Sequence, residues 1–250
     1  MSQRDMNSYL SEYLELEYES FQERLRRDEV IRILDQKQFS RLLEVGCGRE
    51  SIFIDSRLKI SGGTVLEPIN ELLELQRSRL PSPDITFVNQ TFQEFVLGRH
   101  WDPESFDVVL VSSLLHELDD SAAFLSLLAE RIGKNVTVVI VVPNALSIHR
   151  SLALVRGDIN SIDETSTTQS RMQQLGGVFT KERLSTSLES SGLEVAEIFT
   201  AIPKFFHHSK MALLMSENEK FGSLIEEISV FRDAFEPHGS EIFAIARRGK

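Results

Sequence analysis

The chain has 250 residues, which corresponds to one ordinary domain or to one domain with a lid. Its hydrophobic content of 41% and charged content of 26% are close to the globular average, which excludes a disordered chain, a collagen-like fibre and a coiled-coil rod. The formal net charge is -11, so the chain as a whole lacks the positive surface potential that attracts a phosphate backbone. We therefore expect no nucleic-acid partner.

Cysteine content and hydropathy indicate a compartment. The single cysteine, Cys47, excludes an internal disulfide and fits a reducing environment. Residues 1–20 are polar and acidic, without the apolar stretch of a signal peptide. The longest apolar run, residues 136–142, is too short to cross a bilayer. The sequence therefore predicts a cytoplasmic protein with no membrane partner.

The first 36 residues carry apolar side chains at three- and four-residue steps, which predicts a helix. The opposite face carries acidic side chains, among them Glu19 and Glu23, that anionic lipid would repel. The apolar stripe is therefore interpreted as a packing face. We expect residues 1–39 to form a helical extension of a domain that spans residues 40–250.

Five short apolar segments follow and alternate with helical patterns. Apolar runs without alternation indicate strands buried on both faces, and intervening helices indicate right-handed crossovers and parallel pairing. The segments predict a doubly wound α/β core over residues 40–144. The expected strands are residues 41–45, 64–66, 85–88, 106–111 and 136–142.

The pattern loosens after residue 144. Glycines and a polar run predict a lid over residues 147–180, with a helix at 148–155. A helix at 181–191 and a strand at 193–201 come next. Residues 204–236 form a predicted helical insertion before a final strand at 241–246. No repeat and no linker composition divides the chain.

The first predicted strand ends in Gly46-Cys47-Gly48. Glycines without a Cβ allow the backbone to pass close beneath a ligand, and in a parallel sheet ligands bind at this edge. Glu67 ends the second strand, nineteen positions after Gly48, where a carboxylate can accept hydrogen bonds from ribose hydroxyls. Together these features predict an adenosine-containing cofactor.

The charge beside the glycines distinguishes between cofactors. A dinucleotide site would have a glycine at position 51, which is Ser51 here. Glu44 would repel a pyrophosphate and attract the ammonium group of a methionine, so it favours S-adenosylmethionine. The alternative interpretation of Glu44 is a solvated charge at the end of a strand.

Three motifs, LLEVGCG at residues 42–48, VLEP at 65–68 and FDVVLVSSLLHELDD at 106–120, resemble those of class I S-adenosylmethionine-dependent methyltransferases. Residues 141–153 and 176–195 resemble the small-molecule branch, which includes enzymes of quinone, antibiotic and surface-sugar biosynthesis. The resemblance implies a seven-stranded Rossmann-like sheet, mostly parallel with its last strand antiparallel.

The resemblance also implies a cofactor site. Glu44, Gly46, Cys47 and Gly48 would hold the methionine end, Glu67 and Pro68 the ribose, Gln90, Thr91 and Phe92 the adenine, and Ser112 would lie beneath the cofactor. Two residues depart from the family pattern. Gln90 stands where many members have an aspartate, and Glu50 where many have a third glycine. Glu50 either tunes methionine binding or weakens the site.

Histidine suits a general base near neutral pH. His116 follows the fourth predicted strand and His149 the fifth, so both leave the ligand-binding edge of the sheet and are the candidate catalytic residues. Either histidine could instead be a packing or solvent-facing residue. His207 and His208 have no third ligand at suitable spacing, so no metal site is expected.

These features predict transfer of a methyl group from S-adenosylmethionine to an oxygen or nitrogen atom of a small metabolite, possible acceptors including a sugar. One alternative is a non-catalytic nucleoside-binding relative that acts through a protein partner. Another is a protein methyltransferase. The expected partner is the small-molecule acceptor, and a homodimer is left open.

Overall fold

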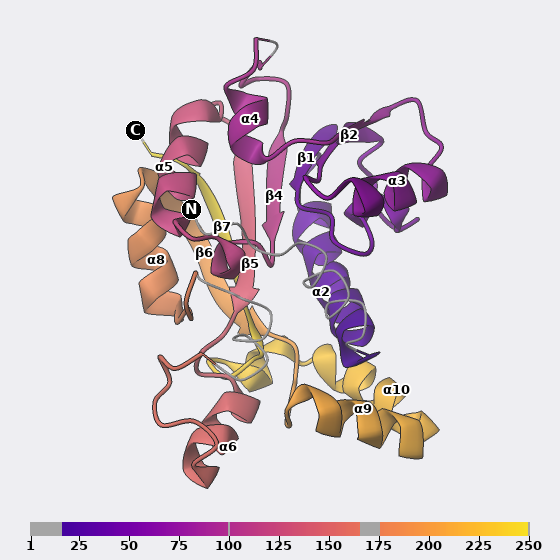
Figure 1. Ribbon diagram of the computed structural model, residues 1–250, viewed down its shortest axis with the longest axis vertical. Helices are drawn as coiled ribbons and strands as arrows, with labels where there is room; N and C mark the ends of the chain where they lie inside the picture. The colour runs from indigo at the N-terminus through magenta and orange to yellow at the C-terminus, as the bar shows by residue number, and fades with distance from the viewer. Residues whose placement is uncertain (1–16, 100, 166–175, 250) are drawn as a thin grey trace.

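The structure, a computed structural model, describes residues 17–99, 101–165 and 176–249. The first half of the predicted N-terminal helix and part of the predicted lid, residues 166–175, lie outside the described residues. Seven strands form one sheet in the order β3-β2-β1-β4-β5-β7-β6 (Figure 1). The strands are β1 (Arg41–Val45), β2 (Gly62–Leu66), β3 (Ile85–Val88), β4 (Val108–Ser112), β5 (Thr137–Pro143), β6 (Leu193–Ala201) and β7 (Glu241–Arg248).

Pairing in the sheet follows the predicted pattern. β1, β2, β3, β4 and β5 pair in parallel, and β7 is antiparallel to both β5 and β6. The expected mostly parallel Rossmann-like sheet with an antiparallel last strand is therefore confirmed. In the register, Val45 lies opposite Leu66 and Val111. The residues that follow these three positions consequently meet at one edge of the sheet.

Helices cover both faces of the sheet. One buried core includes α2, α3, α9 and α10, and the other includes α4, α5 and α8. The helices are α2 (Glu17–Asp35), α3 (Asn70–Arg79), α4 (Phe92–Val96), α5 (Ser121–Arg131), α6 (Ile148–Arg156), α8 (Lys181–Ser190), α9 (His208–Glu217) and α10 (Glu219–Ser229). Three short 3₁₀ turns complete these elements: Ile52–Ile54, Leu115–Glu117 and Arg232–Phe235.

The N-terminal helix packs against the sheet. Phe21, Leu25 and Val30 of α2 are buried in the same core as Leu110 and Val139 of the sheet. The described part of the predicted extension is therefore one helix whose apolar stripe is a packing face, as its periodicity indicates.

The predicted helical insertion at residues 204–236 contains two separate helices. Two helices, α9 and α10, meet at Asn218, whose side chain accepts a hydrogen bond from the Lys220 amide and caps α10. An asparagine side chain satisfies a free amide at a helix start, which favours a break here. In Figure 1, α9 and α10 lie below α2.

The chain after β5 turns back on the edge of the sheet. Helix α6 ends at Gly157, which has a φ of +76°. The Ala145 amide donates a hydrogen bond of 2.7 Å to the Phe179 carbonyl, which holds both ends of the excursion together. Among the helices of the described residues, none has the length and apolar character needed to cross a bilayer.

Candidate functional site

A cavity of about 430 Å³ lies at the carboxyl ends of β1, β2, β4 and β5. Its wall also includes one face of α2, residues 177–178, Lys204 and His208. Sequence-predicted residues in the wall are Glu44, Gly46, Cys47, Gly48, Glu67, Pro68, Ser112, His116 and His149. The fold therefore brings together residues that are far apart in the sequence.

The turn after β1 requires glycine because of its backbone conformation. Gly46 has a φ of +78° and Gly48 a φ of +55°, in the left-handed region that L side chains rarely adopt. The Gly46 amide donates a hydrogen bond of 2.8 Å to the Leu66 carbonyl. Among the described residues, the nearest neighbour of a Cβ at Gly46 would be Leu114, at 4.0 Å. The space beside this turn is therefore open to a ligand.

Glu44 is buried, which argues against its interpretation as a solvated charge. The Ser51 hydroxyl donates a hydrogen bond to one carboxylate oxygen, and the Ile52 amide donates to the other at 2.8 Å. Burial raises the pKa of Glu44 to about 7, although these two hydrogen bonds oppose the shift. Glu44 thus closes the loop 46–52 as well as lining the cavity.

Glu67 is buried at the end of β2. The Ile69 amide donates a hydrogen bond of 3.0 Å to Oε1, and the Cys47 thiol lies 3.7 Å from Oε2. Burial raises the pKa of Glu67 and also that of the Cys47 thiol. A thiol held in this way is a weak nucleophile. Cys47 therefore acts as a small wall residue between the two glycines.

The segment expected to flank an adenine lies outside the wall of this cavity. Thr91 caps α4, where its side chain and that of Glu94 form a capping box. Phe92 is buried in the second core, with its ring 5.2 Å from that of Phe124. Gln90 is exposed. The short helix α4 was not among the predicted elements, although the capping box Thr91–Glu94 is a local signal for a helix start.

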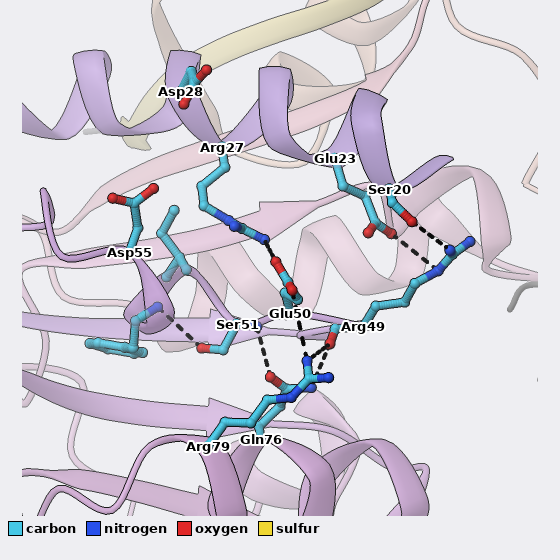
Figure 2. A network of polar contacts seen from close by, with 12 residues as sticks. Ser20, Glu23, Arg27, Asp28, Arg49, Glu50, Ser51, Asp55, Gln76 and Arg79 are labelled. Atoms are coloured by element: carbon cyan, nitrogen blue, oxygen red, sulfur yellow. Dashed lines mark hydrogen bonds and ion pairs between the residues drawn. The ribbon is translucent and has the colours of Figure 1, made fainter. Parts of the chain in front are cut away.

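Glu50, the departure from the family pattern, is paired with two arginines (Figure 2). Arg27 of α2 approaches Oε2 at 2.7 Å, and Arg79 at the end of α3 approaches Oε1 at 3.8 Å. The charge that Glu50 adds to the glycine loop is therefore balanced locally.

The same loop is attached to the two helices by further polar contacts, drawn in Figure 2. Arg49 donates a hydrogen bond of 3.1 Å to the Ser20 hydroxyl of α2. Gln76 of α3 donates to the Arg49 carbonyl at 2.8 Å and accepts from the Ser51 amide at 3.1 Å. The N-terminal helix and α3 thus hold the glycine loop from both sides.

A buried polar cluster lies between α2 and β7, and its members Gln22, Arg26 and Lys204 line the cavity, although the sequence did not predict them as site residues. Glu241 of β7 accepts hydrogen bonds from Arg26 at 2.7 and 2.6 Å and from Gln22 at 2.7 Å. Lys204 donates to Gln22 at 2.8 Å. Polar residues at positions 22, 26 and 29 interrupt the apolar stripe of α2, and this was the only local signal.

The two candidate histidines both line the cavity. Their Nδ1 atoms are buried and have no hydrogen-bond partner among the described residues. Burial lowers the pKa of His116. Burial, together with the nearby charges of Lys204 and Arg150, holds the pKa of His149 well below its usual value. Burial therefore favours the neutral form of both imidazoles.

Comparisons with known proteins agree with this geometry. A family model described as a methyltransferase domain matches residues 18–198. The N-methyltransferase NodS from Bradyrhizobium japonicum WM9, with S-adenosylhomocysteine, has a TM-score of 0.58 and 15% identity over 98% of this chain and 100% of that chain. The plantazolicin methyltransferase BpumL, with S-adenosylhomocysteine, has a TM-score of 0.59 and 15% identity over 100% and 92%.

A methyltransferase from Mesorhizobium loti that depends on S-adenosylmethionine has a TM-score of 0.56 and 16% identity over 88% of this chain and 96% of that chain. At these identities the likeness concerns the fold. A comparison with curated protein sequences finds no match.

Proposed function

The chain belongs to the methyltransferase-domain family, and from this premise we propose that it transfers the methyl group of S-adenosylmethionine to an oxygen or nitrogen atom of a small metabolite. The enzyme class and the cofactor follow from the family. What we propose beyond the family is the size of the acceptor, the residues that bind both substrates and the catalytic residues.

The cavity has the chemistry that S-adenosylmethionine requires. The glycine turn offers open space at Gly46, the buried Glu67 carboxylate suits the ribose hydroxyls, and Glu44 suits a cationic methionine end. When bound, S-adenosylmethionine supplies a methyl group that its positive sulfur activates for displacement. The protein then has to bind and align the acceptor and exclude water.

The limited volume of the cavity is the observation that supports a small acceptor. A volume of about 430 Å³ lies near the lower end of the range for small-molecule pockets and must hold a cofactor as well. Helix α2, the segment after β5, Lys204 and His208 line its sides. One structural neighbour supports a small acceptor, because the plantazolicin methyltransferase BpumL was crystallised with a monoazolic desmethylPZN analogue and S-adenosylhomocysteine.

We assign the role of proton acceptor to His149 or His116, because a neutral, buried imidazole at the cavity wall can take a proton from a hydroxyl or amine. Their lowered pKa values place the rise of rate with pH below about pH 6.5, the usual histidine value. In this proposal, the described parts of residues 147–180 close over the bound acceptor.

Calorimetry with S-adenosylmethionine and S-adenosylhomocysteine, followed by methyl-donor consumption against metabolite pools, tests this function. Replacing the true base by alanine should lower turnover by roughly 10²–10⁴-fold with cofactor affinity nearly unchanged, whereas the other histidine should matter much less. Cofactor binding without consumption in any pool would indicate the non-catalytic alternative. Consumption only with protein substrates would indicate a protein methyltransferase.

A further inference from the structure

Lys204 is a buried cation in the wall of the cavity, with only 5% of the residue exposed. Its ammonium group donates to the Gln22 side chain at 2.8 Å and lies 2.9 Å from Nδ1 of His208. Both partners are uncharged when His208 is neutral, and burial lowers the pKa of His208. Among the described residues, no carboxylate oxygen lies within ion-pair distance of Lys204.

The two carboxylates nearest to this region are already engaged. Arg26 donates to both oxygens of Glu241 and approaches Glu19 at 3.3 Å, and His208 lies 3.0 Å from the other oxygen of Glu19. Burial nevertheless lowers the pKa of Lys204 to about 8, against the opposing effect of both carboxylates. The ammonium group of Lys204 also lies 5.2 Å from the centre of the Tyr18 ring, so its charge is partly compensated without an ion pair.

Buried donors without partners lie in the same part of the wall. Ser240 is 2% exposed, and its buried hydroxyl has no hydrogen-bond partner among the described residues. The buried Nδ1 atom of His149 likewise has no partner there. Arg150 adds a second cation to this wall, oriented by hydrogen bonds to the carbonyls of Ile162 and Glu164. A buried polar group without a partner costs free energy unless a ligand satisfies it.

The backbone that presents Lys204 is strained. Ile202, two residues earlier, has a φ of +70°, which is unfavourable for a β-branched side chain. Its carbonyl accepts a hydrogen bond of 2.8 Å from the Ser240 amide, so the strain also positions Ser240. Strain of this kind is retained mostly at binding and catalytic sites.

The cavity is polarised along the sheet. Glu44 lies in β1 and Glu67 follows β2, whereas His149, Arg150 and Lys204 follow β5 and β6. In the strand order, β4 separates these two groups. One side of the cavity therefore suits a cation, as the cofactor is, and the other side suits an anion.

We propose that Lys204, with Ser240 and His149, binds an anionic oxygen group of the methyl acceptor, so that the acceptor is a small metabolite carrying a carboxylate or a phosphate. This inference rests on the proposed function, because it names the acceptor of the same cavity. An ammonium group and neighbouring neutral donors form charge-assisted hydrogen bonds with either acid.

The test uses the full chain loaded with S-adenosylhomocysteine. A panel of small carboxylates and phosphate monoesters, each paired with its neutral amide or alcohol, is titrated by calorimetry. We expect the ligands that bind to be acids, with affinities at least about tenfold above those of their neutral counterparts. The carboxylate and phosphate arms identify which acid the site accepts.

Three variants locate the anion. Lys204→Met should reduce acid binding at least about tenfold and leave the affinity for S-adenosylhomocysteine unchanged. Lys210→Met removes an exposed lysine of α9 and should change neither affinity. Ser240→Ala, which leaves no buried partner unsatisfied, should weaken acid binding about threefold to tenfold and covers the case in which Lys204→Met does not fold.

Several outcomes would overturn the inference: no acid binds, neutral counterparts bind equally well, or neither Lys204→Met nor Ser240→Ala weakens acid binding. Methyl transfer to a neutral metabolite would also refute it while leaving the proposed function intact. Failure of the wild-type chain to bind S-adenosylhomocysteine would instead contradict the proposed function itself, so the two failures are distinguishable.

Discussion

Gly46 illustrates how one backbone angle controls the cofactor side of the cavity. Its φ is +78°, and a Cβ there would have open space around it rather than a steric clash. A Gly46→Val side chain would project into that space and strain the turn by roughly 1–3 kcal/mol. We expect the affinity for S-adenosylhomocysteine to fall at least about tenfold, measured by calorimetry.

Gly157→Val is the matched control for Gly46→Val. Gly157 has a φ of +76°, no atom of the described residues lies within 4 Å of its Cβ position, and the residue is not part of the cavity wall. The control should lose similar stability and keep its cofactor affinity. Equal affinities in the two variants would show that the cofactor does not approach the glycine turn.

The ionisation of Glu44 predicts a pH dependence. Burial raises its pKa to about 7, so the folded chain without cofactor retains a proton that the unfolded chain loses near pH 4.5. This contribution to stability is present below pH 4.5 and is lost as pH rises through about 7. A cationic cofactor prefers the ionised carboxylate, so its affinity changes in the opposite direction.

Affinity for S-adenosylmethionine should therefore increase with pH by up to about tenfold per unit below pH 7 and level off above it. Calorimetry between about pH 5.5 and 8.5 measures this effect. Glu44→Gln should flatten the profile, with a residual slope from Glu67, whose pKa is also raised by burial. An unchanged slope in Glu44→Gln would assign the effect to another group.

At the scale of elements, two of the ion pairs that attach α2 to the domain differ in their burial. The side chains of Arg26 and Glu241 are 11% and 0% exposed, whereas those of Arg27 and Glu50 are 13% and 43% exposed. Leaving a buried charge without its partner costs about 3–5 kcal/mol, but a partly exposed pair contributes about 1 kcal/mol or less.

Glu241→Gln should accordingly lower the free energy of unfolding by roughly 3 kcal/mol or more, and Arg27→Ala by no more than about 1 kcal/mol. Urea denaturation of both variants measures the difference. Similar losses would mean that the attachment of α2 depends on the glycine loop as much as on β7.

At the scale of the whole molecule, cofactor binding should stabilise the fold. The cavity wall joins α2, the ends of several strands and the insertion before β7, so a ligand that fills it binds only the folded chain. S-adenosylhomocysteine at about 100 times its Kd should add about 2.7 kcal/mol and raise Tm by roughly 5–11 °C. Gly46→Val should show little increase at the same concentration.

The sequence alone determined the elements whose signals are local. Apolar runs predicted the strands of the sheet, and Gly46, Gly48 and Glu67 marked the strand ends where the structure has its cavity. Such features are readable because a strand pattern or a positive φ depends on a few consecutive residues.

Only the tertiary structure decided which distant side chains complete the cavity. Arg26 and Glu241 are separated by 215 positions, and Lys204 and Gln22 by 182. No local pattern specifies such pairs, because their contact depends on how α2 packs over the sheet and where the insertion after β6 returns. The histidines likewise lay at strand ends in the sequence, but their lowered pKa values arise from burial and from charges that the fold brings beside them.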